Sequence, residues 1–260
     1  MKTTRTVTAV ALAGLLFGLS CQVQAEEQRV RVATDGTFPP YSMVGADGSL
    51  SGFDVDITHA LCAEMQVRCE LTQYDFDAMI PALKARKFDM IVASMAITEE
   101  RRRSIAFSDK YEGGYSQFIG RKDSGLSGEP AAMANRRIGV QRGSIQENYA
   151  REVFGAVGAK VTSYDNPELA WLDLQSGRLD AVMVEVGVGV ELKKREGAEA
   201  FDFFGPKFDD PDYFGTGSGI AVRKQDTALL ARLNQALKAI LANGTYKRIN
   251  DTYFDYDQYE

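Results

Sequence analysis

Short β-rich runs alternate with helical periodicity along most of the chain. Runs of apolar and β-branched residues predict strands, and apolar residues three and four apart predict helices between them. The predicted strands cover residues 29–33, 70–74, 89–93, 138–140, 160–164 and 179–184. The predicted helices cover residues 54–65, 76–84, 145–154, 167–175 and 227–241, and a last one begins at Thr245. Repeated β-α-β units predict an α/β fold with mostly parallel sheets flanked by helices.

Two stretches rich in Gly or Pro interrupt this alternation, YEGGYS at 111–116 and DDPDYFGTGSG at 209–219. If both are crossings between lobes, residues 26–112 and 214–260 form lobe one. Residues 113–213 then form lobe two, with hinge segments at its ends. A chain that crosses twice makes a hinge that closes without unfolding either lobe. A single domain with two long loops is the alternative.

The first residues have the pattern of an export signal. Two basic residues precede an apolar run over 7–19 that is too short to span a bilayer, and the small-residue pattern VQA follows at 23–25. We therefore expect residues 1–25 to be a signal peptide, cleaved after Ala25. Cys21 would permit a lipoprotein, but a lipobox has Leu three residues before the Cys, where this chain has Gly18.

Charge and cysteine content narrow the class of protein. The chain has a net charge of −6, which becomes −8 when the two basic leader residues are removed. This acidity argues against binding to nucleic acid or anionic membranes, and mildly favours a cationic ligand. Cys62 and Cys69 remain after cleavage, and we expect a disulfide contributing about 2.5 kcal/mol in the chain-entropy model. Two free buried thiols are the alternative.

The sequence offers little for catalysis or metal binding. The single His59 lies in a predicted helix, and there is no nucleophile-elbow or phosphate-loop motif. The Gly-rich run at 215–219 lacks the spacing of a dinucleotide fingerprint. Two Cys and one His are too few ligands for a metal site. We expect no enzyme activity, metal or cofactor.

Two segments indicate a site for an anion. The run VQRGSIQ at 140–146 ends a predicted strand, turns on Gly and begins a helix, whose free N–H groups suit a carboxylate. Arg101 follows the strand at 89–93, and strand carboxyl ends present ligand sites in open α/β sheets. A solvated charge beside Arg102 and Arg103 is the alternative for Arg101.

Longer segments carry a family resemblance that covers almost all of the chain after residue 25. They are VRVATDGTFPPYS (30–42), GFDVDI (52–57), the pair Cys62 and Cys69, DFDAMIPALKARKFD (75–89), ASMAITEERR (93–102), FSDKY (107–111), GSIQENYA (143–150), GRLDA (177–181), YFGTGSGIAVRK (213–224) and GTYKRINDTYFDY (244–256). Together they resemble the polar amino-acid-binding proteins of ABC importers (solute-binding protein family 3), especially the histidine and lysine/arginine/ornithine-binding group.

This resemblance implies a two-lobed, type II periplasmic-binding-protein fold with a ligand between the lobes. Arg101 and the Ile145 N–H would hold an α-carboxylate, and Glu185 would accept from an α-ammonium. Phe38 and Phe76 would flank the ligand side chain. The expected ligand contacts are Asp35, which would meet a distal cation, Phe38, Phe76, Ala93, Ser94, Met95, Ala96, Arg101, Gln141, Ser144, Ile145, Gln146 and Glu185.

Several positions depart from the family pattern. Ala96 and Ile145 stand where hydroxyl residues are usual, Ala93 replaces a Ser, Gln141 replaces an apolar residue, and Glu185 is longer than the usual Asp. A buried ammonium missing one acceptor costs about 1–3 kcal/mol. The ligand is therefore either an ordinary polar or cationic amino acid, or an opine or guanidino acid without a free α-amino group.

The resemblance also implies a location and partners. We expect a monomer in the periplasm that delivers its ligand to the membrane permease of an ABC importer. A sensor that docks to a signalling receptor is an alternative. From another class, an enzyme similar to cyclohexadienyl dehydratase would use Glu185 as a general acid.

Overall fold

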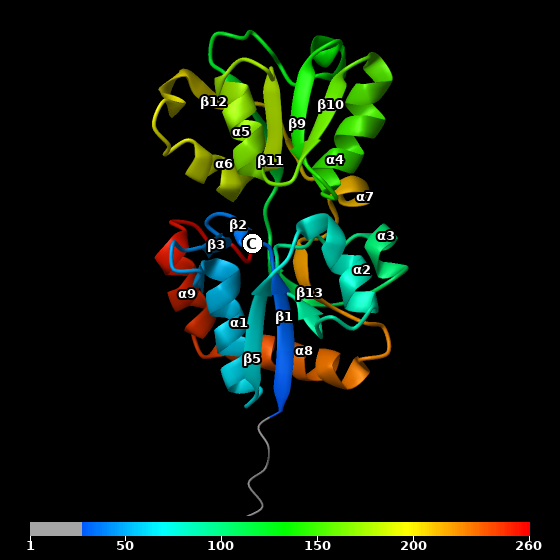
Figure 1. Cartoon of the computed structure of the whole chain (residues 1–260), viewed down its shortest axis with the longest axis vertical. Helices are drawn as coiled ribbons and strands as arrows, with labels where there is room; N and C mark the ends of the chain where they lie inside the picture. The colour runs from blue at the N-terminus through cyan, green and yellow to red at the C-terminus, as the bar shows by residue number, and fades with distance from the viewer. Residues whose placement is uncertain (1–27) are drawn as a thin grey trace, which may run out of the picture.

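The structure, a computed structural model, describes residues 28–260 and consists of two stacked lobes, each built on a five-stranded sheet (Figure 1). The predicted signal peptide and its cleavage site lie outside these residues. No helix in the described range is long and apolar enough to cross a bilayer. The α/β, two-lobed fold class predicted from the sequence is confirmed.

Lobe one combines the beginning and the end of the chain. Its sheet has the order β5-β1-β6-β13-β7. The strands are β1 (Arg29–Thr34), β5 (Arg68–Gln73), β6 (Met90–Ile91), β7 (Ala106–Glu112) and β13 (Ser218–Val222). A small sheet of β2 (Thr37–Phe38), β3 (Ser42–Val44) and β4 (Leu50–Ser51) lies beside it. Its helices are α1 (Phe53–Glu64), α2 (Met79–Lys84), α3 (Glu99–Arg102), α8 (Thr227–Ala242) and α9 (Thr245–Tyr253).

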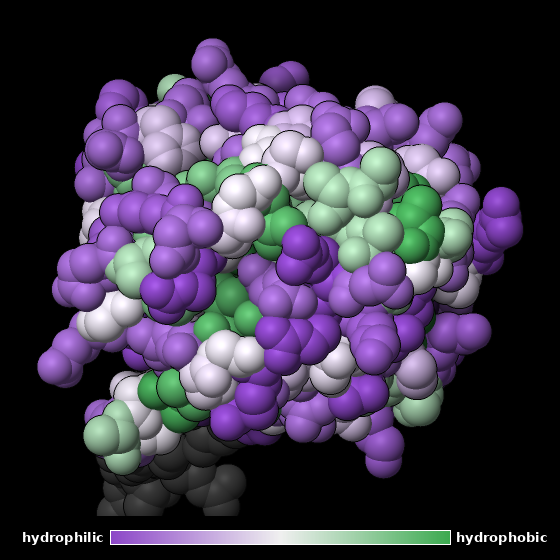
Figure 2. Space-filling model, turned by 90° about the horizontal axis from the view of Figure 1, so that it is seen from above, coloured by the Kyte–Doolittle hydropathy of each residue, from purple (hydrophilic) through white to green (hydrophobic). Residues whose placement is uncertain are grey.

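Lobe two is one continuous stretch of chain. Its sheet has the order β10-β9-β11-β8-β12. The strands are β8 (Ser116–Arg121), β9 (Arg137–Gln141), β10 (Lys160–Tyr164), β11 (Ala181–Glu185) and β12 (Phe201–Phe208). Its helices are α4 (Ile145–Tyr149), α5 (Pro167–Gln175) and α6 (Val186–Leu192). Seen from above, the outer end of this lobe is mainly hydrophilic, and its apolar side chains form small separate areas (Figure 2).

Each sheet is mostly parallel, as predicted, and has one strand that runs against the other four. In lobe one, β13 runs antiparallel to β6 and β7. In lobe two, β8 runs antiparallel to β11 and β12. Each of these two strands begins directly after a crossing between the lobes.

The chain passes between the lobes at residues 113–115 and again between β12 and β13. The second passage contains α7 (Pro211–Phe214). Both passages fall within the Gly- and Pro-rich stretches picked out in the sequence, while β7, β8 and β13 extend into those stretches. The boundaries proposed for the lobes, after residues 112 and 213, stay a prediction.

Local chemistry explains several helix ends near the cleft. Gly52, with φ of 120°, precedes α1 where a Cβ would lie 2.4 Å from the Tyr41 carbonyl oxygen. Asn166 caps α5 by accepting from the Leu169 N–H at 3.0 Å, and Pro167 occupies the first turn. The predicted helix at 145–154 is instead α4 followed by one π-helical turn over Ala150–Phe154.

Three apolar clusters support the sheets, and a disulfide fastens the edge of lobe one. Phe53, Leu61 and Trp171 are among the buried side chains of the largest cluster. Cys62 of α1 is bonded to Cys69 of β5, which confirms the predicted disulfide. The rigid sheets therefore hold the loops at their carboxyl ends, which face the other lobe.

Candidate ligand-binding cleft

A cleft lies between the lobes and is lined by side chains of both. Ten of the thirteen predicted contact residues line it: Phe38, Phe76, Ser94, Ala96, Arg101, Gln141, Ser144, Ile145, Gln146 and Glu185. They come from both lobes. His59 is exposed on α1 and does not line the cleft.

Asp35, Ala93 and Met95 do not line the cleft. Ala93 and Met95 are 2% and 1% exposed and belong to an apolar cluster of lobe one. Ser94, whose φ is 45°, and Ala96 line the cleft, while the side chains of Ala93 and Met95 pack in the core of lobe one. Asp35 is 4% exposed and is covered by other side chains. The resemblance implied ligand contacts along the whole segment and did not resolve which of its side chains face the cleft.

Arg101 is the cation of the cleft. Thr98 caps α3 by accepting from the Arg101 N–H. The guanidinium donates from Nη1 to the Ala96 carbonyl at 3.0 Å and from Nη2 to the Gly143 carbonyl of lobe two at 3.1 Å. It lies over the Phe76 ring, 5.5 Å from the centroid.

The environment of Arg101 suits an anion. No carboxylate within residues 28–260 forms an ion pair with it, and burial lowers the pKa of its guanidinium to about 10. Two of its five N–H groups are used by carbonyls, so three remain for a ligand. A bound carboxylate would supply the missing counter-charge.

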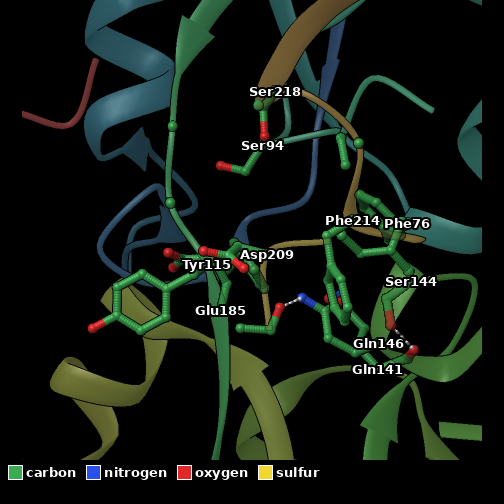
Figure 3. Close-up of a pocket in the computed structure, with 18 of the residues that line it drawn as sticks. Phe76, Ser94, Tyr115, Gln141, Ser144, Gln146, Glu185, Asp209, Phe214 and Ser218 are labelled. Atoms are coloured by element: carbon green, nitrogen blue, oxygen red, sulfur yellow. Dashed lines mark hydrogen bonds between the residues drawn. The ribbon is translucent and has the colours of Figure 1, made fainter. Parts of the chain in front are cut away.

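The start of α4 forms the facing wall in lobe two. Ser144 caps this helix, because its Oγ accepts from the Glu147 N–H at 3.1 Å and donates to the Gln141 carbonyl at 2.7 Å. Ile145 and Gln146 are in the first turn, where N–H groups have no carbonyl four residues earlier to bond. The Gln146 side chain donates to Ser116 Oγ at 2.9 Å (Figure 3).

Glu185 supplies a carboxylate where β11 ends and α6 begins. Its Oε2 accepts from the N–H groups of Gly187 at 2.7 Å and Val188 at 3.2 Å, so it caps the helix. Its Oε1 is buried without a hydrogen-bond partner among the described residues. Burial raises the pKa of this carboxyl to about 7. An ammonium donor would satisfy the unpaired oxygen and favour the ionised form.

A group of buried acids lies behind Ser94. The Tyr111 hydroxyl donates to Asp54 Oδ1 at 2.6 Å, and Ser94 Oγ donates to Asp54 Oδ2 at 3.2 Å. The Ser94 N–H donates to the Tyr111 hydroxyl at 2.9 Å, which holds Ser94 at its positive φ of 45°. Burial raises the pKa of Asp54 to about 7, and burial raises the pKa of Glu112 well above its usual range. A cationic ligand group on this side of the cleft would favour the ionised forms of both carboxyls.

The two lobes are already in contact across the cleft. Besides the bond from Arg101 to Gly143, the Gln141 Nε2 atom of lobe two donates to Asp35 Oδ2 of lobe one at 2.8 Å. Gly187 of lobe two faces Tyr41 of lobe one, whose hydroxyl oxygen would lie 2.5 Å from a Cβ at position 187. The cleft is therefore closed in this structure.

Sequence reasoning missed the residues that the crossings contribute to the cleft. They are Gly113, Gly114, Tyr115, Asp209, Phe214, Gly215 and Gly217, with Ser116 and Ser218 at the adjoining strand ends. Figure 3 shows Tyr115, Asp209 and Phe214 at the cleft together with Glu185 and Phe76. The sequence does mark these residues, because both segments interrupt the strand and helix pattern. That interruption indicates a hinge between lobes, and it does not by itself indicate that the same residues line the cleft.

A two-lobed fold with a polar interlobe cleft and a double crossing is typical of solute-binding proteins. In comparison with known proteins, the family model "bacterial extracellular solute-binding proteins, family 3" matches residues 30–256. The chain belongs to this family.

Individual relatives are similar along nearly their whole length. The L-arginine-binding protein of Pseudomonas aeruginosa is 41% identical over 93% of both chains. The lysine/arginine/ornithine-binding periplasmic protein of Escherichia coli is 39% identical, over 94% of this chain and 96% of its own. The solved structure of an ancestral arginine-binding protein bound to arginine superposes on this chain with a TM-score of 0.81 and is 35% identical in sequence. The match covers 88% of this chain and 99% of the ancestral protein.

Proposed function

We propose that this protein is the periplasmic binding component of an ABC importer and that it captures arginine or a similar polar or cationic amino acid. The observation that carries the proposal is the pair of unsatisfied charges in the cleft, the Arg101 guanidinium without a carboxylate and the Glu185 carboxyl with a free Oε1. A zwitterion neutralises both. The named ligands of the relatives support the same class.

The free oxygen of Glu185 also bears on the choice between ligand types. A guanidino acid that lacks an α-ammonium would leave this buried acceptor unpaired, at a cost of about 1–3 kcal/mol, whereas the secondary ammonium of an opine still has N–H groups to donate. An ordinary amino acid provides the donor. The unpaired Oε1 of Glu185 therefore supports a ligand with an α-ammonium, even though Ala96 contributes no hydroxyl.

Binding would stabilise the closed form. The carboxylate would touch Arg101 of lobe one and the Ile145 N–H of lobe two, so the ligand has higher affinity for the state in which both are near. A ligand that prefers one state shifts the hinge equilibrium toward it. The closed form would then be the one recognised by the membrane permease, and we propose that the protein acts in this way as a monomer.

A thermal-unfolding screen tests the proposal. Refolded, ligand-stripped protein would be heated with single amino acids, opines, guanidino acids and polyamines. A ligand at 100 times its Kd adds about 2.7 kcal/mol, which raises the midpoint by about 5–10 °C for a protein of this size. Arginine, lysine, ornithine or histidine should give such a shift. No shift with any carboxylate would refute the proposal.

Catalysis is the competing function, because a carboxyl with a pKa of about 7 can act as a general acid. In our proposal Glu185 serves as a ligand acceptor and the protein binds without turnover. Incubation with prephenate-like acids, followed by chromatography, distinguishes the two. Product formed in excess of the protein would favour the enzyme.

A further inference from the structure

Gln141 stands between the cleft and a buried carboxylate. It is the last residue of β9 in lobe two, lines the cleft and is 7% exposed. Its Nε2 donates to Oδ2 of Asp35 across the interlobe boundary at 2.8 Å. Asp35 follows β1 in lobe one and does not line the cleft.

The hydrogen bonds of Asp35 are supplied by neutral groups. Its Oδ1 accepts from the Thr37 N–H at 3.1 Å and from the Thr37 hydroxyl, and its Oδ2 accepts from Gln141. No Lys or Arg in residues 28–260 forms an ion pair with it; the ion pairs of Asp89 with Arg31 and Arg223 in lobe one do not involve Asp35. The charge of Asp35 is therefore held by three neutral donors, of which one belongs to the other lobe.

The orientation of the Gln141 amide follows from this contact. A carboxylate accepts hydrogen bonds, so the atom bonded to Asp35 must be the nitrogen. The Oε1 atom then has no donor among the described side chains and is available to a ligand N–H. A ligand side chain at this wall meets an amide oxygen and not a carboxylate.

We propose that Gln141 is a specificity-determining residue: it screens Asp35 and lets the cleft accept amino acids with a neutral, N–H-donating side chain, such as a ureido or carboxamide group, nearly as well as cationic ones. The inference rests on the proposed function, because the ligand must be an amino acid held at Arg101. It deepens that function by stating what the side-chain wall recognises.

Arginine and citrulline form a matched pair of probes, because they differ in a guanidinium against a neutral ureido group of nearly the same shape. In the wild-type protein the citrulline Kd should lie within about tenfold of the arginine Kd. Gln141→Ala removes the screen and opens a path to Asp35. Hydrogen bonds to charged groups are stronger than neutral ones, so the arginine preference should rise by about tenfold or more.

A double-mutant cycle separates this effect from simple loosening of the cleft. Asp35→Asn should leave the arginine-to-citrulline ratio near the wild-type value, because the charge is already screened. The double variant Asp35→Asn with Gln141→Ala should not show the increased preference for arginine over citrulline that Gln141→Ala shows alone. All four proteins would be titrated by calorimetry at low salt.

The results are decisive in either direction. A Gln141→Ala ratio equal to the wild-type ratio would overturn the inference. The inference would also be overturned if the wild type strongly preferred arginine and Asp35→Asn abolished that preference. This second test requires only that the conservative Asp35→Asn variant folds. If neither arginine, citrulline nor any other amino acid binds the wild type, the proposed function itself fails. That result differs from binding with an unexpected ratio.

Discussion

Replacing Arg101 tests the carboxylate site most directly. Three guanidinium N–H groups remain after the bonds to Ala96 and Gly143, and two of them can hold a carboxylate bidentately. Each hydrogen bond between charged groups contributes about 1.5–3 kcal/mol. Arg101→Met should therefore weaken arginine binding by about 10²–10⁴-fold. Arg101→Lys keeps the charge and one bond, and should weaken binding by about 10–150-fold.

The ligand-free protein should respond little to the same change. Arg101→Met removes a cation that has no carboxylate partner within the described chain, but it also leaves the Ala96 and Gly143 carbonyls without a donor. These effects oppose each other, so we expect a stability change within about 1 kcal/mol, or about 2–4 °C in the midpoint. Calorimetric titration measures the affinity, and thermal unfolding without ligand measures the stability.

Arg102→Met is the matched control for both assays. Arg102 is the next residue on α3, its side chain is 45% exposed, and it pairs only loosely with Glu99 at 4.0 Å. Surface pairs of this kind contribute about 0–1 kcal/mol. The Kd of Arg102→Met for arginine should stay within about threefold of the wild-type Kd. If folded Arg101→Met binds within tenfold of wild type, the carboxylate does not lie at Arg101 and the reasoning is wrong.

Three further outcomes follow from the structure. Burial raises the pKa of Glu185 to about 7, so protonated Glu185 contributes its full stabilisation below about pH 4.5, and this stabilisation is lost as the pH rises through 7. Between pH 5 and 8, thermal unfolding without ligand should therefore show a smaller loss of stability for Glu185→Gln than for the wild type. Replacing Cys62 and Cys69 with Ser removes a crosslink of a short loop, costing about 2.5 kcal/mol or about 5–10 °C, while calorimetry should find the same affinity. In Gly187→Ala the new Cβ would lie 2.5 Å from the Tyr41 hydroxyl oxygen of the other lobe, so calorimetry should show about tenfold weaker ligand binding. The unfolding midpoint without ligand should not fall, because Ala favours a helix. An unchanged Kd for the ligand would contradict the closed geometry.

The sequence predicted the longest helices and the parallel strands because their periodicity is strong. The helix assigned to 167–175 and the strand assigned to 160–164 agree with α5 and β10 residue for residue. The strands β7, β8, β12 and β13 were not predicted. Antiparallel strands next to the crossings contain Gly and charged residues, which weaken the apolar signal that identifies a buried strand.

The candidate site was predicted in outline but not in its internal contacts. Motif resemblance placed Arg101, Glu185 and the two Phe residues at the cleft, because residue type and order are preserved there. It could not show that Gln141 bonds to Asp35, since that contact joins residues 106 positions apart on different lobes. Nor could it show that Glu185 divides its two oxygens between a helix cap and the cleft.

The place of β13 in the lobe-one sheet has a consequence for how the chain folds. This strand lies between β6 and β7, yet it is made from residues 218–222. Until the ribosome has released that segment, β7 has no neighbour in its sheet, and the first half of the chain cannot finish folding. The sheet of lobe two is complete once Phe208 has been synthesised. The lobe that begins first is therefore completed last, and pairing over such long sequence separations is slow.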